Sequence, residues 1–540
     1  MNTHTPTRSP NDAPLTPLRF LERSAEVFPN KPAIIYGERT LDYSEFRDAA
    51  ERMALAIRAR ITPGDRVVFL APNIPELLIA HYAVPLAGGV LVALNPRLSR
   101  DEVHYILNHC GARLLFVDAE FIPVVGDVLA AAPTLTGVIE LADAEFGLAA
   151  SAADCDFGQV PLAAFLAEGD VLGDALAHPL VWDVQDERAA ISINYTSGTT
   201  GKPKGVLYSH RGAYLNSLGE VFHNSFRPDS VYLWTLPMFH CNGWCTTWAV
   251  TAAGATHVPL RAVRPAAVWA AIDELGVTNL CGAPTVCSTI ANADQAHPLA
   301  HPLNITTAGA PPSPTVIEQL ERLGIGVVHV YGLTEVYGPY TICEFQPEWN
   351  QLTSAERAVK ISRQGVAMVQ AESARVVDSA MDDVPRDGAT IGEIVLRGNN
   401  VMIGYYNDAA ATAEAFRGGY FHTGDLAVMH PDGYIEIKDR AKDIIISGGE
   451  NISTIEVENA LVAHPAVLDA AVVGVPHPHW GERPKAYIVL RPGHEATAEE
   501  ILDATRLLIA GFKVPDYVVF VADLPRTATG KIMKVTLRLS

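Results

Sequence analysis

The feature that most constrains the fold is a repeated alternation of short apolar runs with longer amphipathic stretches, from about residue 33 onward. "RVVFLAP" precedes "IPELLIAHYAVPLAGG", and "VTNLCGAP" precedes "TVCSTIANAD". Such alternation is typical of strand–helix–strand units, which build a mostly parallel sheet with helices on both faces. The sequence therefore predicts an α/β fold whose ligands bind outside the carboxyl ends of the strands.

The region after about Gly392 has a different pattern, with short strands and turns that continue to Asp439 and Arg440. It contains "HPDGY", whose Asp-Gly pair signals a tight β-hairpin. Beyond Arg440, amphipathic helices and two apolar strands predict a small α+β domain. We therefore predict an N-terminal domain of residues 1–438, with mostly parallel sheets and a β-barrel-like subdomain, and a C-terminal domain of residues 439–540.

Composition argues against several classes of function. The formal net charge is −21 with no compensating basic run, which disfavours nucleic acid and anionic membranes as partners. Residues 77–96 and 230–260 lack charged side chains, but Pro, Gly, His and Asn interrupt them, so we interpret both as buried interior and not as membrane spans. Seven cysteines without a C-x-x-C pair suit a reducing compartment, and the N-terminus lacks a signal peptide, so we expect a cytoplasmic protein.

The stretch "YTSGTTGKPKG", residues 195–205, has the composition of a phosphate-binding loop. It does not fit the pattern G-x-x-x-x-G-K-[ST], because Thr196 stands at the first glycine position and Pro203 follows the lysine. Its glycines would still let backbone N–H groups approach oxygen atoms, and its hydroxyls and lysines add donors and charge. A surface turn rich in Gly and Thr is the alternative.

Five separated stretches combine glycine with polar or charged residues at the ends of predicted strands. They are residues 196–205, 307–314 ("TAGAPPSP"), 331–335 ("YGLTE"), 422–425 ("HTGD") and 527–531 ("TATGK"). Together they resemble the motifs of the adenylate-forming superfamily of acyl-CoA synthetases, luciferases and peptide-synthetase adenylation domains. The resemblance runs from about Leu18 to the C-terminus. It implies an enzyme that joins a carboxylic acid to AMP, releases pyrophosphate and passes the acyl group to CoA.

The resemblance also implies a nucleotide site, residue by residue. The residues expected to hold the β- and γ-phosphates of ATP are Thr196, Ser197, Gly198, Thr199, Thr200 and Lys204. Those expected at the adenine are Gly309, Ala310 and Pro311, with Tyr331 stacking on the base and Gly332 following it. Asp425 would accept hydrogen bonds from both ribose hydroxyls, and Arg440 and Lys442 would reach the ribose or a phosphate.

Four residues are expected to act in catalysis: Thr334, Glu335, Lys531, and His240 in the acyl pocket. By resemblance, Glu335 binds Mg²⁺, Thr334 lies beside the α-phosphate, and Lys531 lies over the carboxylate and the α-phosphate during adenylation. Without the resemblance, a glutamate after a strand is most often a solvated loop residue or helix cap, and a lysine in this position is ordinarily an exposed cation. Coumarate-type ligases have a further lysine where this sequence has Ile446, so that nucleotide contact is not carried over.

A moving C-terminal domain follows from the same resemblance. It would turn about Asp439 after adenylation, withdraw Lys531, and bring Ser447, Gly448 and Gly449 toward a tunnel for the pantetheine of CoA. The other interpretation of the three-residue loop is a plain turn before a helix that starts near Ser453.

The acyl pocket is expected along "MFHCNGW" and the segment after "LTE". His240 resembles the family's gate residue beside the carboxylate, and the residues expected in the wall are Asn242, Trp244, Tyr337 and Gly338. All of them could instead belong to the core. "FHCNGWCTTW" resembles the plant and bacterial acyl-activating branch, which takes short or medium-chain fatty acids and aryl or cinnamic-type acids. Because these stretches contain no cation, we expect a monocarboxylate with an apolar body.

The predicted cofactors are ATP, Mg²⁺ and CoA, and a homodimer is compatible with the sequence. Two other functions remain open. The acceptor could be an amine, a carrier protein, or nitrite activated in place of a carboxylate. A non-catalytic nucleotide-binding protein is the second alternative, although Lys531, Glu335 and Asp425 are all present.

Overall fold

The computed structural model describes residues 9–126, 128–148, 158–174, 180–196, 202–309, 314–440, 442–448, 450–527 and 532–539. The chain divides into two compact units. Unit 1 comprises residues 1–362, 367–372 and 397–415, and unit 2 comprises residues 363–366, 373–396 and 416–540. Asp439 lies within unit 2, and the domain boundary expected there remains a prediction.

Unit 1 contains two sheets whose inner strands are parallel. One sheet has the order β19–β9–β8–β4–β3–β5–β6–β7. Its strands are β3 (Arg66–Leu70), β4 (Val90–Leu94), β5 (Ala112–Asp118), β6 (Gly137–Leu141), β7 (Val160–Pro161), β8 (Ala190–Thr196), β9 (Lys204–Ser209) and β19 (Gly404–Tyr405). Strands β3 to β8 pair in parallel, whereas β9 pairs antiparallel with both β8 and β19.

The other sheet runs in the order β16–β15–β14–β13–β12–β10–β11–β1–β2, with the two-residue edge strand β16 (Val366–Ala367) next to β15. Its strands are β1 (Pro32–Tyr36), β2 (Arg39–Asp42), β10 (Val231–Trp234), β11 (Thr256–Pro259), β12 (Asn279–Gly282), β13 (Leu303–Thr307), β14 (Ile325–Leu333) and β15 (Gly338–Ile342). The pairs β1–β2 and β14–β15 are antiparallel, whereas the described pairs among β10 to β14, and β1 with β11, are parallel. The parallel inner strands end at a common edge, where β13 leads to Gly309 and β14 leads to Thr334.

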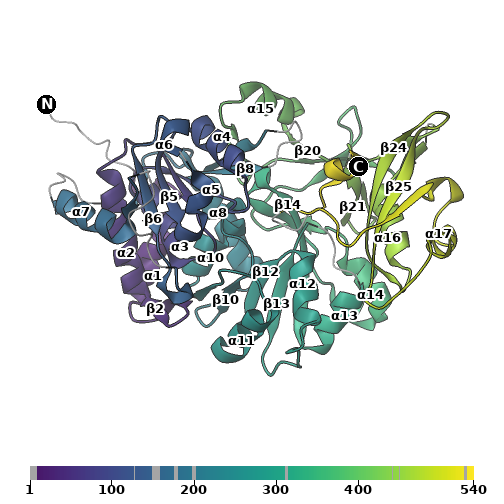
Figure 1. Cartoon of the computed structure of the whole chain (residues 1–540), viewed down its shortest axis with the longest axis horizontal. Coiled ribbons are helices and arrows are strands. Elements are labelled where there is room, and N and C mark those ends of the chain that lie inside the picture. The colour runs from purple at the N-terminus through teal and green to yellow at the C-terminus, as the bar shows by residue number, and fades with distance from the viewer. Residues whose placement is uncertain are drawn as a thin grey trace. The chain divides into compact units, whose positions relative to one another are not determined.

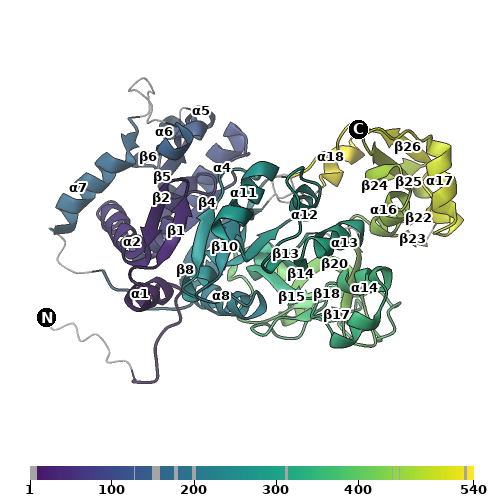
Figure 2. The same ribbon diagram turned by 90° about the horizontal axis from the view of Figure 1, so that it is seen from below.

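Helices cover the strands of unit 1 on both faces (Figures 1 and 2). The longer ones are α1 (Leu18–Val27), α2 (Tyr43–Arg58), α3 (Pro75–Leu86), α4 (Arg100–Cys110), α7 (Leu162–Asp174), α8 (His210–His223), α11 (Pro265–Leu275), α12 (Pro284–Ala291), α13 (Pro314–Arg322) and α14 (Ser354–Ile361). The shorter ones are α5 (Ile122–Val125), α6 (Val128–Ala131), α9 (Cys241–Trp244), α10 (Thr246–Ala252) and α15 (Ala409–Ala415). This arrangement confirms the predicted α/β class.

The two stretches without charged residues are interior, as expected. The first forms α3, in which every residue except Glu76 is buried, and the fully buried strand β4. The second forms β10, α9, α10 and β11, all of which are almost entirely buried. None of the helices in the described ranges has both the length and the apolar run that crossing a membrane requires.

Unit 2 contains an antiparallel sheet and a mixed sheet, in which β26 (Tyr517–Phe520) pairs in parallel with β25 (Gly481–Leu490). Its first sheet has the order β17 (Arg375–Val377), β18 (Gly392–Leu396), β20 (Phe421–Met429) and β21 (Ile435–Arg440), and occupies the region expected to form a β-barrel-like subdomain. The predicted Asp-Gly hairpin is confirmed, because Met429 pairs with Ile435 across the turn. There Gly433 adopts a positive φ of 85°, which favours glycine.

The C-terminal part of unit 2 is a sheet with helices on both faces (Figure 2). Its elements are β22 (Ile445–Ser447), β23 (Glu450–Ile452), α16 (Thr454–Val462), β24 (Val467–His477), β25 (Gly481–Leu490), α17 (Ala498–Arg506), β26 (Tyr517–Phe520) and α18 (Lys534–Arg538). Alternate residues of β24 face opposite sides, as the period of a strand requires. Val472 packs with α16 and α17, whereas Val473 packs with Leu537 of α18.

Three histidines of unit 1 are buried in their neutral form. Burial lowers the pKa of His81 and of His210 to about 4, and the pKa of His257 to about 3. His257 Nδ1 accepts a hydrogen bond from Trp234 Nε1 (3.1 Å), and its Nε2 lies 2.9 Å from Thr251 Oγ1. Protonating such a ring would place a charge in the core without a counter-ion.

We therefore expect unit 1 to lose stability as the pH falls from about 6.5 to 4. Each histidine has a lower pKa in the folded state than in the unfolded chain, so the unfolded chain takes up the proton first as the pH falls. By pH 4 this lowers the free energy of unfolding by roughly 3 kcal/mol for each histidine. Urea unfolding followed by tryptophan fluorescence at each pH measures this loss. His257→Gln should flatten the profile, whereas His297→Gln, at an exposed position, should not; an unchanged profile in the first variant would contradict the assignment.

Candidate active site

The loop predicted to bind phosphate is the connection between β8 and β9. The final pair of this antiparallel ladder is Thr196 opposite Lys204, so both residues lie at the base of the loop. The loop residues Ser197, Gly198, Thr199 and Thr200 lie outside the described residues. A Cβ at Gly205 would come within 2.8 Å of Ile193 Cγ2, so a side chain there would displace β9. Strand pairing therefore fixes the two ends of the loop.

Tyr405 links the loop base to the residue expected to bind magnesium. It lies on β19 opposite Val206 of β9. Lys204 Nζ lies 4.8 Å from the centroid of the Tyr405 ring, a cation–π contact. The Tyr405 hydroxyl donates a hydrogen bond to Glu335 Oε1 (2.9 Å). Burial and the nearby Glu335 carboxylate raise the pKa of Tyr405, so the hydroxyl stays protonated as this donor.

A cavity of about 100 Å³ adjoins this contact. Its lining residues are Tyr105, His109, Lys202, Pro203, Lys204, Tyr405, Tyr406 and Asp408. Lys202 Nζ lies 5.5 Å from the Tyr105 ring centroid, so both lysines of the loop end are placed over aromatic rings. Aromatic faces orient the two ammonium groups without neutralising them, which suits the binding of an anion such as phosphate.

Thr334 and Glu335 directly follow β14, at the carboxyl end of the parallel strands. The Thr334 carbonyl accepts a hydrogen bond from the Tyr208 hydroxyl (2.6 Å), and the Glu335 carbonyl accepts one from Met402 N (2.8 Å). A Cβ at Gly332 would come within 1.7 Å of the Gly338 carbonyl oxygen, so only glycine fits there. The backbone of "YGLTE" is thus held from several sides.

The predicted adenine residues are partly described. Gly309 follows β13 with a φ of 100°, a conformation that favours glycine, whereas Ala310 and Pro311 lie outside the described residues. Tyr331 pairs with Thr341 across β14 and β15 and is 8% exposed.

The segment that follows His240 has an unusual backbone. Residues 241–245 all have positive φ, between 52° and 63°, and form one left-handed turn. Each non-glycine residue in this conformation costs roughly 1–2 kcal/mol. Thr246 Oγ1 and Thr247 Oγ1 donate hydrogen bonds to the carbonyls of Gly243 (2.6 Å) and Asn242 (3.1 Å), which helps to hold the turn. Strain of this kind occurs mostly at functional sites.

The other residues of the expected acyl pocket surround this turn. Asn242 Oδ1 accepts hydrogen bonds from Ser192 Oγ (2.8 Å) and Asn194 Nδ2 (2.9 Å), and its side chain is buried. Trp244 lies against Gly338, where a Cβ would come within 2.8 Å of the indole. Tyr337 is fully buried, and its hydroxyl accepts a hydrogen bond from Ser209 N (2.6 Å). These side chains are therefore fixed by protein contacts.

In unit 2, Asp425 and Arg440 lie opposite each other on β20 and β21. Asp425 is buried, and one of its carboxylate oxygens forms an ion pair with Arg440 Nε (3.1 Å). Burial, and next the charge of Arg440, lower the pKa of Lys442. In the loop expected to approach CoA, Ser447 Oγ lies 3.3 Å from Arg483 Nη1. Gly448 has a φ of 60° and contacts Trp480, and Gly449 is outside the described residues.

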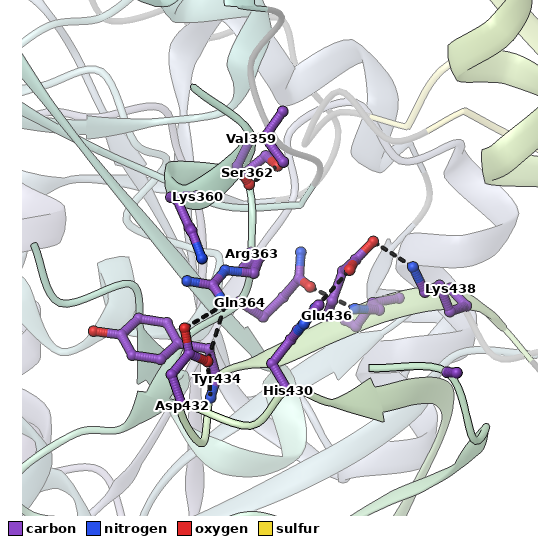
Figure 3. A network of polar contacts seen from close by, with 12 residues as sticks. Val359, Lys360, Ser362, Arg363, Gln364, His430, Asp432, Tyr434, Glu436 and Lys438 are labelled. Atoms are coloured by element: carbon purple, nitrogen blue, oxygen red, sulfur yellow. Dashed lines mark hydrogen bonds and ion pairs between the residues drawn. The ribbon is translucent and has the colours of Figure 1, made fainter. Parts of the chain in front are cut away.

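The strand that leads to Asp439 is fixed by polar contacts, which Figure 3 shows. Gln364 Oε1 accepts a hydrogen bond from Ile437 N (2.6 Å). Glu436 forms an ion pair with Lys438 (2.5 Å), and its Oε2 lies 2.8 Å from His430 Nε2. Burial opposes ionisation of Glu436, but the contacts with Lys438 and His430 outweigh it and lower the pKa of the carboxyl group.

Asp439 itself is buried, and its carboxylate is bonded to the start of α16. Oδ2 accepts hydrogen bonds from Thr454 N (2.5 Å) and Thr454 Oγ1 (2.8 Å). Lys531 lies outside the described residues. Within unit 1, Lys204 pairs with Thr196 at the loop base, and Glu335 follows Thr334 after β14. Sequence reasoning missed Tyr405, which contacts both Lys204 and Glu335.

Comparison with known proteins identifies the class. The AMP-binding enzyme family matches residues 21–406, and its C-terminal domain family matches residues 456–531. The chain belongs to the AMP-binding enzyme family. It is 44% identical to an acetate–CoA ligase of Humulus lupulus (99% of this chain, 96% of the relative) and 41% identical to a butyrate–CoA ligase of Arabidopsis thaliana (98% and 93%). A trans-cinnamate:CoA ligase of Petunia hybrida is 40% identical (98% and 94%).

The fold of this chain also matches those of solved structures. ATP-bound MatB from Rhodopseudomonas palustris superposes with a TM-score of 0.82 at 26% identity, covering 97% of this chain and 98% of that one. An o-succinylbenzoate coenzyme A synthetase of Bacillus subtilis, in complex with ATP and magnesium ion, gives a TM-score of 0.79 at 26% identity (96% and 98%). The prediction of an AMP-forming acid–CoA ligase that uses ATP, Mg²⁺ and CoA is confirmed.

The expected cytoplasmic location is wrong by the same comparison. Five of the similar plant proteins, among them the butyrate and trans-cinnamate ligases, are named as peroxisomal. The expectation relied on the apolar content of the N-terminal segment and on cysteine usage. Neither property indicates whether the chain carries a targeting signal that an import receptor recognises, so the inference about location had no physical basis.

Proposed function

We propose that the protein activates a small apolar monocarboxylate as its adenylate and transfers the acyl group to CoA. The observation that carries the assignment of the phosphate and metal site is the contact series Lys204–Tyr405–Glu335, which joins the loop end to the segment after β14. An ATP-dependent acid ligase needs cationic side chains at the leaving pyrophosphate, and it needs a magnesium-binding carboxylate close to those side chains.

The residues present fit magnesium. Among the described residues, Glu335 Oε1 accepts the Tyr405 hydrogen bond and Oε2 has no hydrogen-bond partner, which leaves a hard oxygen donor for a cation. Bound there, Mg²⁺ would neutralise charge on the phosphates. Thr334 and Glu335 would be its nearest side chains on this segment.

In the first half-reaction a substrate carboxylate oxygen attacks the α-phosphorus of ATP, and the bond to the bridging oxygen of pyrophosphate breaks. Thr196 and Lys204, with the loop residues between them, would hold the β- and γ-phosphates, and Lys531 would neutralise charge between the carboxylate and the α-phosphate. Asp425, with Arg440 beside it, would hold the ribose. In the second half-reaction the CoA thiolate attacks the acyl carbon and AMP leaves.

The domain movement between the two half-reactions is part of the proposal. Residues 439–540 would turn as a body about Asp439, which exchanges Lys531 for the loop at Ser447 and Gly448. The two family matches, residues 21–406 and 456–531, lie on either side of that residue and support this division. Homodimer formation remains a prediction.

The substrate class follows from the segment around His240. Residues 230–260 contain no Asp, Glu, Lys or Arg, so this region offers no cation to a second carboxylate. Trp244 packed against Gly338 limits the room for a long chain. The similar plant enzymes are named for acetate, butyrate, benzoate and trans-cinnamate, all monocarboxylates, and this supports the same class here.

An acid panel tests the proposal. CoA-dependent AMP release is measured with acetate, butyrate, hexanoate, benzoate, cinnamate and malonate, and again with nitrite in place of an acid. We expect turnover with at least one of the small monocarboxylates and none with malonate, because two charges would enter a site without a matching cation. AMP release with nitrite alone, or malonate as the best substrate, would contradict the proposal.

A further inference from the structure

The carboxylate of Asp439 belongs to a buried polar network that extends to the end of the chain. Thr454, the first residue of α16, is fully buried and donates two hydrogen bonds to Asp439 Oδ2, from its backbone N (2.5 Å) and from Oγ1 (2.8 Å). Next to it, Ser453 Oγ donates to the carbonyl of Lys438 (2.5 Å). The residue expected to be the hinge is therefore attached to α16 as well as to its own strand.

Lys534, the first residue of α18, continues this network. Its Nζ donates a hydrogen bond to Thr454 Oγ1 (2.5 Å) and forms an ion pair with Glu458 (2.8 Å) on the next turn of α16. The two ion-pair side chains are each only 15% exposed. Glu458 Oε1 also accepts a hydrogen bond from Val472 N (2.8 Å), so the carboxylate is bonded from two directions. Thr454 Oγ1 both donates and accepts, which couples the Asp439 and Lys534 contacts.

Helix α18 is attached to the segment after Asp439 at its other end too. Arg538 forms an ion pair with Asp443 (2.6 Å) and donates to the carbonyl of Lys442 (3.2 Å). The Leu537 side chain is buried against β24 and β25, and its carbonyl accepts a hydrogen bond from the Tyr487 hydroxyl (2.8 Å). The segment that immediately follows Lys531 is therefore fixed relative to the residues around Asp439.

We propose that Lys534 is a positioning residue for adenylation: through Thr454 it couples the buried carboxylate of Asp439 to α18, the helix that begins three residues after Lys531. The inference deepens the proposed function and rests on it. Lys534 lies three residues after Lys531, so their Cα atoms are at most about 10 Å apart. A shift of α18 relative to Asp439 consequently moves the backbone that delivers Lys531.

A purely structural ion pair would behave differently. A buried pair can usually be replaced by uncharged residues of similar volume at little cost, provided that both partners are removed together. Such a replacement leaves both half-reactions unchanged if the pair only stabilises the fold. Adenylation alone requires Lys531, so loss of the Lys534 contact to Thr454 should affect that half-reaction selectively.

The test compares two double variants. Lys534→Met/Glu458→Gln removes both charges, while the amide oxygen of the introduced glutamine can still accept from Val472 N. The control, Lys513→Met/Glu456→Gln, removes another ion pair of the same helix (2.7 Å) that does not reach Thr454. Thr454→Val, nearly isosteric, leaves the Lys534–Glu458 pair in place and removes only the Oγ1 contacts. Three rates or signals are measured: acid-dependent ATP–pyrophosphate exchange, thioester formation from a preformed acyl-adenylate, and hydrogen–deuterium exchange of residues 454 and 534–538.

We expect Lys534→Met/Glu458→Gln and Thr454→Val to lower kcat of the exchange reaction about 10-fold or more, with KM for ATP and the thioester step within about twofold. In both, the amides of residues 454 and 534–538 should exchange faster than in the control. Equal loss of both half-reactions, or no loss in either, would overturn the proposal. Pyrophosphate exchange by the wild-type protein without any acid would contradict the proposed function. Separately, unchanged amide exchange in the two variants would overturn the positioning role of Lys534.

Discussion

Replacing Lys531 by alanine is expected to lower acid-dependent ATP–pyrophosphate exchange by about 10²–10³-fold, while thioester formation from a preformed acyl-adenylate stays within about twofold. During adenylation, charge develops on the α-phosphate and the departing pyrophosphate, and a lysine ammonium supplies a positive charge on a flexible stem that can later be withdrawn. The thioester step starts after pyrophosphate has left and does not need that charge.

The two half-reactions are measured separately, with labelled pyrophosphate for the first and with synthetic acyl-adenylate and CoA for the second. Lys513→Ala, which removes another lysine of the C-terminal segment, is the control and should retain both rates. Equal losses in the two half-reactions of Lys531→Ala would show that the lysine supports folding or acts throughout the cycle.

Glu335→Gln is expected to lower adenylation by about 10²-fold and to raise the Mg²⁺ concentration needed for half-maximal rate by about 10-fold or more. The substitution keeps an oxygen that can accept the Tyr405 hydrogen bond and removes only the charge that a hard cation requires. Titration of the exchange rate with Mg²⁺ at saturating acid measures both effects.

Tyr405→Phe distinguishes the role proposed for Glu335, binding of Mg²⁺, from that of its neighbour Tyr405. It removes the hydroxyl but keeps the ring under Lys204, so its Mg²⁺ requirement should stay close to that of the wild type while the rate falls modestly. If Glu335→Gln and Tyr405→Phe had the same Mg²⁺ dependence, Glu335 would act through Tyr405 and not through the metal.

The large-scale organisation could be predicted because it depends on local patterns. Alternating apolar and amphipathic stretches predicted the parallel strands, and the Asp-Gly pair predicted the β20–β21 turn. The position of Thr334 and Glu335 directly after β14 followed from the same pattern, since polar loops gather at the carboxyl ends of parallel strands.

The contacts that connect the site could not be predicted. Tyr405 lies on a two-residue strand whose partner, Val206, is about two hundred positions away in sequence, and no local pattern marks such a pairing. The left-handed turn at residues 241–245 includes Trp244 and two cysteines, for which a positive φ is unfavourable. No sequence pattern distinguishes Lys534 from an ordinary exposed lysine near a C-terminus, and its contact with Thr454 becomes visible only in the folded structure.

Mass spectrometry of a reaction without CoA tests the central claim most directly. The wild-type protein is incubated with ATP, Mg²⁺ and butyrate or acetate, and the nucleotide products are identified. Activation of a carboxylate predicts an acyl-adenylate and pyrophosphate in equal amounts, with both absent when the acid is left out. Formation of ADP and phosphate, or pyrophosphate release that does not depend on any acid, would contradict it.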